Sequence, residues 1–242
     1  MFHVKICGVT TADDARLAVE AGADAVGLNF VPGSPRHLGL AAASAVRAAV
    51  PKGAVVVGVF AGATWEEIRR VAEAVGLDAI QLHGLLGAGS DDSIPGSAPV
   101  DPPELCRAVA PLPVIRAVRL EAPPPGGDPL VAARAWIEAA SRLGHAPVMA
   151  IVDATVSRET NAGRLGGTGA VVDWEMLARA RPLPVPTALA GGLTPDNVAA
   201  AIAASGAGAV DTASGVESSP GRKDPARVRA FVAGARAALG LS

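Results

Sequence analysis

Cysteine is scarce in this sequence, since Cys7 and Cys106 are the only two among 242 residues. Two cysteines are too few for a disulfide framework, and these form neither a CxxC pair nor a zinc-ligand cluster, so we expect no metal site. The N-terminal apolar run is too short for a signal sequence and meets acidic residues by position 13. These features predict a cytoplasmic protein.

Long apolar runs and basic clusters are also missing. No segment approaches the ~18 uninterrupted apolar residues of a membrane-spanning helix. Lysine occurs only at Lys5, Lys52 and Lys223, and the formal net charge is −2. Neither nucleic acid nor a membrane is therefore expected as a partner, because both attract clustered positive charge. A phosphate group would have to be held by backbone amides and a few well-placed cations.

Short β-branched runs alternate with alanine-rich amphipathic stretches along the whole chain. Eight alternations favour a parallel sheet with crossover helices, closed as a single (β/α)8 barrel of the TIM type over residues 1–242. An open doubly wound sheet is the alternative. We predict strands over 3–9, 25–31, 54–60, 79–83, 114–120, 147–153, 187–190 and 209–212, and helices near 12–21, 40–50, 65–75, 102–109, 129–143, 174–180, 195–204 and 225–239.

Several predicted helices carry start and stop signals. Thr64 and Glu67 form a capping box, and Gly76 follows the same helix at its end. The pairs at 194–195 and 224–225 each place a capping residue before a proline, which predicts a helix starting at that proline.

The segment 85–103 breaks the alternation of strands and helices. It is rich in Gly, Ser, Pro and Asp and is too polar for a core element. It follows the fourth strand, so in a barrel it projects from the catalytic face. We interpret it as a flexible surface insertion, with a mobile lid as the alternative. The segment 154–165 follows the sixth strand on the same face.

Cys7 ends the first predicted strand, and residues that end different barrel strands converge on one pocket. Lys5 lies on the same face of this strand. A nearby ammonium would lower the pKa of the thiol and favour the thiolate, which can act as a base. The alternatives are a buried apolar cysteine and a structural ion pair between Lys5 and Asp211.

Asp153 ends the sixth predicted strand after an apolar run. A buried unpaired carboxylate is costly, so this residue requires either a partner or a function. It could be a structural group held by a helix N-terminus or by Lys5. It could also be a carboxylic acid with a raised pKa that donates a proton, and its position among the strand ends favours this second interpretation.

Glycine-containing pairs follow the last two predicted strands. Gly191 and Gly192 come before a predicted helix, and Ser214 and Gly215 follow strand eight. Loops in these two places form the recurrent phosphate site of such barrels, because glycines allow backbone amides to approach the phosphate oxygens. We therefore predict a phosphate site built from these four residues.

Two further residues are candidates on the same face. Arg36 follows a proline in the loop after strand two, and its planar fork could pair with a substrate carboxylate. His83 could be an acid or a base, although a packing role is an equal alternative.

Several groups of residues stand in the order found in a known family. They are Lys5–Thr10, Ser34–Arg36, Gln81–Gly84, Val152-Asp153, Gly166–Gly169 with Asp173-Trp174, Gly191–Leu193 with Pro195, Asn197 and Val198, and Ser214–Glu217 with Pro220, Gly221, Lys223 and Asp224. Together they resemble phosphoribosylanthranilate isomerase of tryptophan biosynthesis over nearly the whole chain. The first and last groups are the most specific.

The resemblance implies a cofactor-free Amadori rearrangement of phosphoribosylanthranilate to 1-(2-carboxyphenylamino)-1-deoxyribulose 5-phosphate. It implies that Asp153 is the general acid that protonates the ribose ring oxygen, and that Cys7 is the general base that removes the C2′ proton. It places Arg36 at the anthranilate carboxylate and the glycine loops at the phosphate. We also assign His83 and Asp211 to substrate binding, in a monomer or a homodimer.

The sequence departs from the family pattern at three positions. Leu85 replaces the acidic residue usual after the QLHG motif, Ala170 a lysine, and Val172 a phenylalanine. These changes bear on substrate affinity and loop closure more than on the reaction.

Two other functions are considered. Another phosphate-binding barrel, such as a sugar-phosphate epimerase or a relative of thiamine-phosphate synthase, would explain the glycine loops but not Cys7 and Arg36. A non-catalytic barrel would not be expected to retain Cys7 and Asp153.

Overall fold

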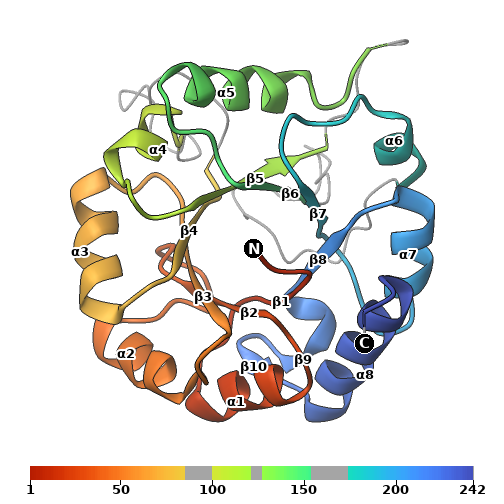
Figure 1. Ribbon diagram of the computed structural model, residues 1–242. Helices are drawn as coiled ribbons and strands as arrows, with labels where there is room; N and C mark the ends of the chain where they lie inside the picture. The colour runs from red at the N-terminus through yellow and green to blue at the C-terminus, as the bar shows by residue number, and fades with distance from the viewer. Residues whose placement is uncertain (85–99, 121–126, 154–173, 242) are drawn as a thin grey trace.

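The computed structural model describes residues 1–84, 100–120, 127–153 and 174–241. Within them, eight parallel strands close into a barrel in which each strand pairs with its sequence neighbours and the first pairs with the last. Figure 1 looks along the barrel and shows the helices as an outer ring. The predicted (β/α)8 barrel is confirmed, and the open-sheet alternative is excluded by the pairing of the first and last strands.

The observed strands all lie within their predicted ranges, because each range contains a short run that can be buried on both faces. They are β1 (Val4–Ile6), β2 (Ala25–Asn29), β3 (Val55–Phe60), β4 (Ala79–Leu82), β5 (Val114–Arg119), β6 (Met149–Asp153), β7 (Thr187–Leu189) and β8 (Ala209–Thr212).

The helices of the outer ring also follow the predicted order. They are α1 (Ala12–Glu20), α2 (Leu40–Ala49), α3 (Trp65–Val75), α4 (Glu104–Ala108), α5 (Val131–Arg142), α6 (Trp174–Arg179), α7 (Val198–Ser205) and α8 (Pro225–Ala238). None of those in the described part of the chain has the length and apolar character that a membrane crossing requires. Between β8 and α8 lie elements that we did not predict, namely the 3-10 helix η1 (Ser214–Val216) and a hairpin of β9 (Glu217–Ser219) and β10 (Arg222–Lys223).

Strand alternation sorts the barrel side chains into two layers. On β1, Val4 and Ile6 belong to the outer layer that packs beneath the helices. Lys5 is in register with Ala25, whose side chain belongs to the inner cluster. The lower part of the interior is filled by apolar side chains such as Phe2. The inward position of Lys5 follows from the strand period of two, and it is in register with the buried Asp211 of β8.

Two predicted helix starts and one stop are confirmed. The Thr64 hydroxyl accepts a hydrogen bond from the Glu67 amide at 3.3 Å, and α3 ends at Gly76 with a φ of 76°. The Asp224 side chain accepts from two backbone amides of the first turn of α8, in which Pro225 is the first residue.

The predicted start of α7 at residue 195 is wrong, because the helix begins at Val198. Thr194–Asn197 forms a turn instead. The Asn197 side chain accepts from the Thr194 amide at 2.8 Å and donates to the Gly192 carbonyl at 3.0 Å. These local hydrogen bonds compete with helix formation, so the helix starts only after the asparagine. The same side chain fixes the backbone of the loop after β7.

The end of the predicted insertion is anchored in the core. Asp101 is fully buried, accepts hydrogen bonds from the amides of Gly62 and Gly84, and pairs with buried Arg116 at 3.3 Å. The Trp136 indole donates to the Asp101 carbonyl at 2.8 Å, and the Arg116 guanidinium lies 4.9 Å from the centre of its ring. Residue 101 thus differs from the flexible surface segment that we predicted over 85–103. Residues 85–99 lie outside the described residues.

We expect Asp101→Ala to lower the free energy of unfolding by about 3–5 kcal/mol, because it leaves the Arg116 charge buried without its counter-charge. Urea unfolding followed by tryptophan fluorescence measures this loss. The matched control is Glu104→Ala, which removes an exposed acid at the start of α4 and should change stability by less than about 0.5 kcal/mol. Equal effects of the two substitutions would contradict the anchoring role.

Candidate active site

A cavity of about 620 Å³ opens at the carboxyl ends of the strands, within the size range of small-molecule sites. All predicted site residues except Gly215 line it. They are Cys7, Arg36, His83, Asp153, Gly191, Gly192, Asp211 and Ser214. The motif at 166–169 and the segment 154–165 lie outside the described residues.

Cys7 sits directly after β1, beside the buried pair of Lys5 and Asp211. The Lys5 ammonium lies 2.9 Å from the Asp211 carboxylate, which confirms the structural ion pair considered from the sequence. Burial raises the pKa of the Cys7 thiol, and the charge of Lys5 lowers it only in part. The predicted lowering of this pKa is therefore wrong in direction, because burial outweighs the charge of Lys5.

Gly27 on β2 makes room for the thiol. A Cβ at this position would lie 2.7 Å from Cys7 Sγ and 3.2 Å from Lys5 Cε. Any larger residue at position 27 must therefore displace the thiol or the end of the Lys5 side chain.

We expect Gly27→Ala to lower kcat/KM by about 10²-fold, because a displacement of roughly 1 Å in an active site has an effect of this size. Steady-state kinetics and thermal melting check the prediction together. Gly58→Ala on β3 is the control, since its Cβ would meet Leu77 and Phe60. That substitution should reduce the melting temperature and leave kcat largely unchanged. The opposite pattern would contradict the account of Gly27.

Asp153 ends β6 and faces His83, whose Nε2 atom lies 3.3 Å from Asp153 Oδ2. Both side chains line the cavity and are only partly exposed. Because the Lys5 ammonium lies on Asp211, the structure favours Asp211 over Asp153 as the partner of that lysine. The contact brings two residues predicted separately from the sequence into one group.

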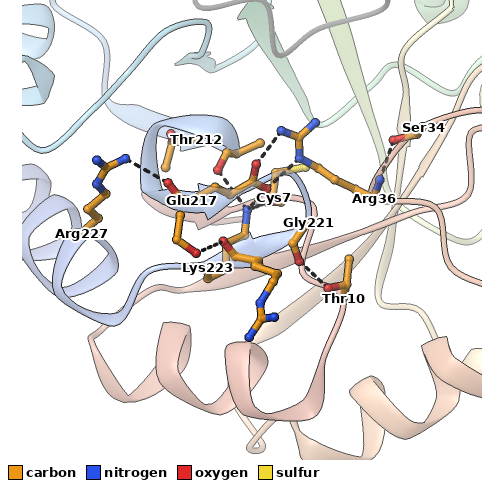
Figure 2. Close-up of polar contacts among 12 residues, drawn as sticks. Cys7, Thr10, Ser34, Arg36, Thr212, Glu217, Gly221, Lys223 and Arg227 are labelled. Carbon is orange, nitrogen blue, oxygen red and sulfur yellow. Dashed lines mark hydrogen bonds and ion pairs between the residues drawn. The ribbon is translucent and has the colours of Figure 1, made fainter.

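Arg36 lies over Cys7 and is held by Glu217 in a bidentate pair. Its Nε and Nη2 atoms donate to the two carboxylate oxygens at 2.8 and 2.7 Å, and the Arg36 amide donates to the Ser34 hydroxyl at 3.2 Å (Figure 2). Gly8 has a φ of 66°, and a Cβ there would lie 2.2 Å from Arg36 Cδ. Only glycine fits at this position beneath the arginine.

Lys223 on β10 is the buried centre of the polar contacts in Figure 2. Its ammonium donates to the Cys7 carbonyl at 2.6 Å, the Ala213 carbonyl at 3.0 Å and the Glu217 carboxylate at 2.9 Å. Burial alone would raise the pKa of Glu217, but the hydrogen bond from Arg36 and the charge of Lys223 hold it below its usual value. Glu217 is therefore ionised at neutral pH.

Sequence reasoning assigned no role to Glu217 or Lys223. Both lie in the last motif group of the family resemblance, so their presence was noted. The signal for their role was weak, because a charge in a loop is usually solvated. Only the fold shows that both side chains are buried.

The loops after β7 and β8 are packed against each other. Gly191 and Gly192 have φ values of 85° and 64°, which favour glycine. The Thr212 hydroxyl donates to the Leu193 carbonyl at 2.8 Å, and a Cβ on Gly215 would lie 1.8 Å from that oxygen. Gly215 thus allows the two loops to approach, while the other predicted phosphate residues line the cavity.

No group of three or more His, Cys, Asp or Glu side chains within the described ranges is arranged to hold a metal ion. The chemistry that these residues offer is proton transfer by a thiol and a carboxyl group, beside a fixed guanidinium.

Fold and cavity together define a barrel enzyme that acts on a small molecule, because such enzymes bind their substrates at the carboxyl ends of the strands. The family model of N-(5'-phosphoribosyl)anthranilate (PRA) isomerase matches residues 4–100 and 132–234. This chain belongs to that family.

Individual relatives agree with this assignment. The chain is 40% identical over 234 residues to N-(5'-phosphoribosyl)anthranilate isomerase of Myxococcus xanthus, covering 97% of this chain and 96% of that protein. The crystal structure of phosphoribosyl anthranilate isomerase from Thermotoga maritima is similar with a TM-score of 0.75, 31% identity, and coverage of 98% and 100%. A crystal structure of the isomerase in complex with reduced 1-(o-carboxyphenylamino)-1-deoxyribulose 5-phosphate has a TM-score of 0.71, with the same identity and coverages.

Proposed function

We propose that this chain isomerises phosphoribosylanthranilate to 1-(2-carboxyphenylamino)-1-deoxyribulose 5-phosphate in tryptophan biosynthesis. The observation that carries the proposal is the cavity itself, which is lined by Cys7, Arg36 and Asp153 together with the glycine loops. A thiol and a carboxyl group supply a base and an acid. The guanidinium and the glycine-rich backbone supply binding for the two anionic groups of the substrate.

Asp153 is the general acid of the first step. Its proton goes to the ring oxygen of the ribose, the bond between that oxygen and C1′ breaks, and the nitrogen lone pair completes a Schiff base at C1′. The Nε2 atom of His83 lies 3.3 Å from Asp153 Oδ2, beside the carboxyl group, but does not form a hydrogen bond with it.

Cys7 is the general base of the second step. The sulfur takes the proton from C2′, and the electrons of that bond move to the Schiff base to give an enolamine, which then tautomerises to the ketone. The Lys5 ammonium beside Cys7 favours the thiolate against the effect of burial. A thiolate accepts protons from carbon at neutral pH far better than a serine hydroxyl would.

The two charged groups of the substrate bind different sets of cavity residues. The anthranilate carboxylate binds Arg36, and the phosphate binds the backbone of Gly191 and Gly192 together with Ser214, with Asp211 nearby for a ribose hydroxyl. These loops meet the usual requirements of a barrel phosphate site, and Asn197 stiffens one of them. We place the reaction in the cytoplasm, in a monomer or a homodimer.

Genetic complementation tests the proposal. Expression of this chain in a bacterial strain that lacks phosphoribosylanthranilate isomerase should restore growth without tryptophan, and the Cys7→Ser variant at the same protein level should not. Failure of the wild-type chain to restore growth, although it accumulates as folded protein, would contradict the proposed function.

A further inference from the structure

Glu217 and Lys223 form a buried layer beneath the cavity. Their side chains are 4% and 0% exposed, and neither residue lines the cavity, whereas Arg36 does. Figure 2 shows Arg36 reaching Glu217 from one side and Lys223 reaching it from the other. The carboxylate therefore stands between two cations, one of which faces the substrate.

The contacts of Arg36 leave one defined part of its guanidinium for a ligand. Of the guanidinium nitrogens, Nε and Nη2 are directed at the two oxygens of Glu217. The other edge of the guanidinium consists of Nη1 and the second N–H of Nη2. Both groups can donate to a carboxylate in two parallel hydrogen bonds. An arginine without such a partner would distribute itself over many rotamers, because its side chain has several free torsions.

We infer that Glu217, held in place by Lys223, is a positioning residue that selects which edge of Arg36 meets the carboxylate of the substrate. The inference rests on the proposed function and adds the residues that give the carboxylate subsite its geometry. The pairing of Arg36 with Glu217 is not evident from the sequence, because Arg36 follows β2 and Glu217 begins the hairpin after β8.

Lys223 links the pair of Glu217 and Arg36 to other parts of the site. The same ammonium that holds Glu217 also donates to the carbonyls of Cys7 and Ala213. One buried charge therefore links the carboxylate subsite to the backbone of the proposed base and to the loop of the proposed phosphate site. A shift of Lys223 would disturb all three, so Glu217 is the better residue for a selective test.

The test compares two ligands that differ only in the carboxylate. One is reduced 1-(o-carboxyphenylamino)-1-deoxyribulose 5-phosphate, and the other is its reduced phenylamino counterpart. Glu217→Gln keeps the shape of the side chain but weakens its hold on Arg36. We expect it to raise the Kd of the first ligand by about tenfold or more, and that of the second by less than about twofold. With substrate, KM should rise more than kcat falls.

A double-variant cycle shows whether the effect passes through Arg36. In an Arg36→Met background, Glu217→Gln should no longer change the ratio of the two Kd values. Asp78→Asn is the matched control, because Asp78 also pairs with an arginine, Arg47, but lies outside the cavity lining. It should leave both Kd values unchanged, even if it lowers the melting temperature.

The outcomes separate this inference from the proposed function. Wild-type protein that binds neither ligand would count against the proposed function. Wild-type protein that prefers the carboxylate ligand, with Glu217→Gln showing the same preference, would overturn the inference alone. If Glu217→Gln does not melt cooperatively, Glu217→Asp replaces it. That variant keeps the charge but shortens the reach, and an unchanged preference would again overturn the inference.

Discussion

Replacing Cys7 with serine is expected to lower kcat by about 10²–10⁴-fold, the usual contribution of a general base. A serine hydroxyl fits the space beside Gly27 but is far less acidic than a thiol, so it cannot take up the C2′ proton at neutral pH. Binding of the reduced product analogue should persist, because the contacts proposed for the carboxylate and the phosphate are made by other residues.

Cys106 supplies the matched control for this prediction. It is the other cysteine of the chain, it is buried in α4, and it does not line the cavity. Cys106→Ser should cost some stability and leave kcat close to the wild-type value. Steady-state kinetics of both variants measure these changes in kcat. A Cys7→Ser enzyme within about a factor of two of wild type would remove the assigned role.

Asp153→Asn is expected to reduce kcat by about 10²–10⁴-fold, since an amide keeps the shape of the carboxyl group but cannot deliver a proton to the ring oxygen. The variant should bind the product analogue and melt within a few degrees of wild type, because Asp153 is partly exposed and Asn keeps its shape.

Asp211→Asn provides the contrast, because it removes the carboxylate that pairs with buried Lys5. Leaving that ammonium without its counter-charge should cost about 3–5 kcal/mol of stability, visible as a large fall in melting temperature. If Asp153→Asn showed this large fall while keeping a near-normal kcat, Asp153 would be a structural residue and the general-acid assignment would be lost.

Much of the fold could be predicted from the sequence, because local pattern and barrel geometry agree. The eight strands were located by their β-branched runs, and the closure followed from their alternation with helices. The start of α7 was misplaced because a threonine before a proline also begins a turn, which the side chain of Asn197 stabilises here. The β9–β10 hairpin has short polar strands, and no apolar alternation indicates it.

Only those candidate site residues that follow directly from the positions of the strand ends could be predicted from the sequence. That Cys7 and Asp153 line one cavity could be predicted, because the ends of barrel strands converge at one mouth. The direction of the pKa shift at Cys7 was wrong, because the sequence shows the neighbouring Lys5 but not the burial that outweighs it. The pairing of Arg36 with Glu217 depends on the hairpin after β8, which folds back to the end of β1.

The most direct test of the account is the fluorescence of phosphoribosylanthranilate after addition of the purified wild-type protein. The account predicts a protein-dependent decay with kcat/KM between about 10⁴ and 10⁸ M⁻¹ s⁻¹, no added cofactor, and a product of unchanged mass that carries a ketone. Cys7→Ser and Asp153→Asn should each lose most of this decay. A signal that falls no faster with folded wild-type protein than in buffer alone would contradict the account.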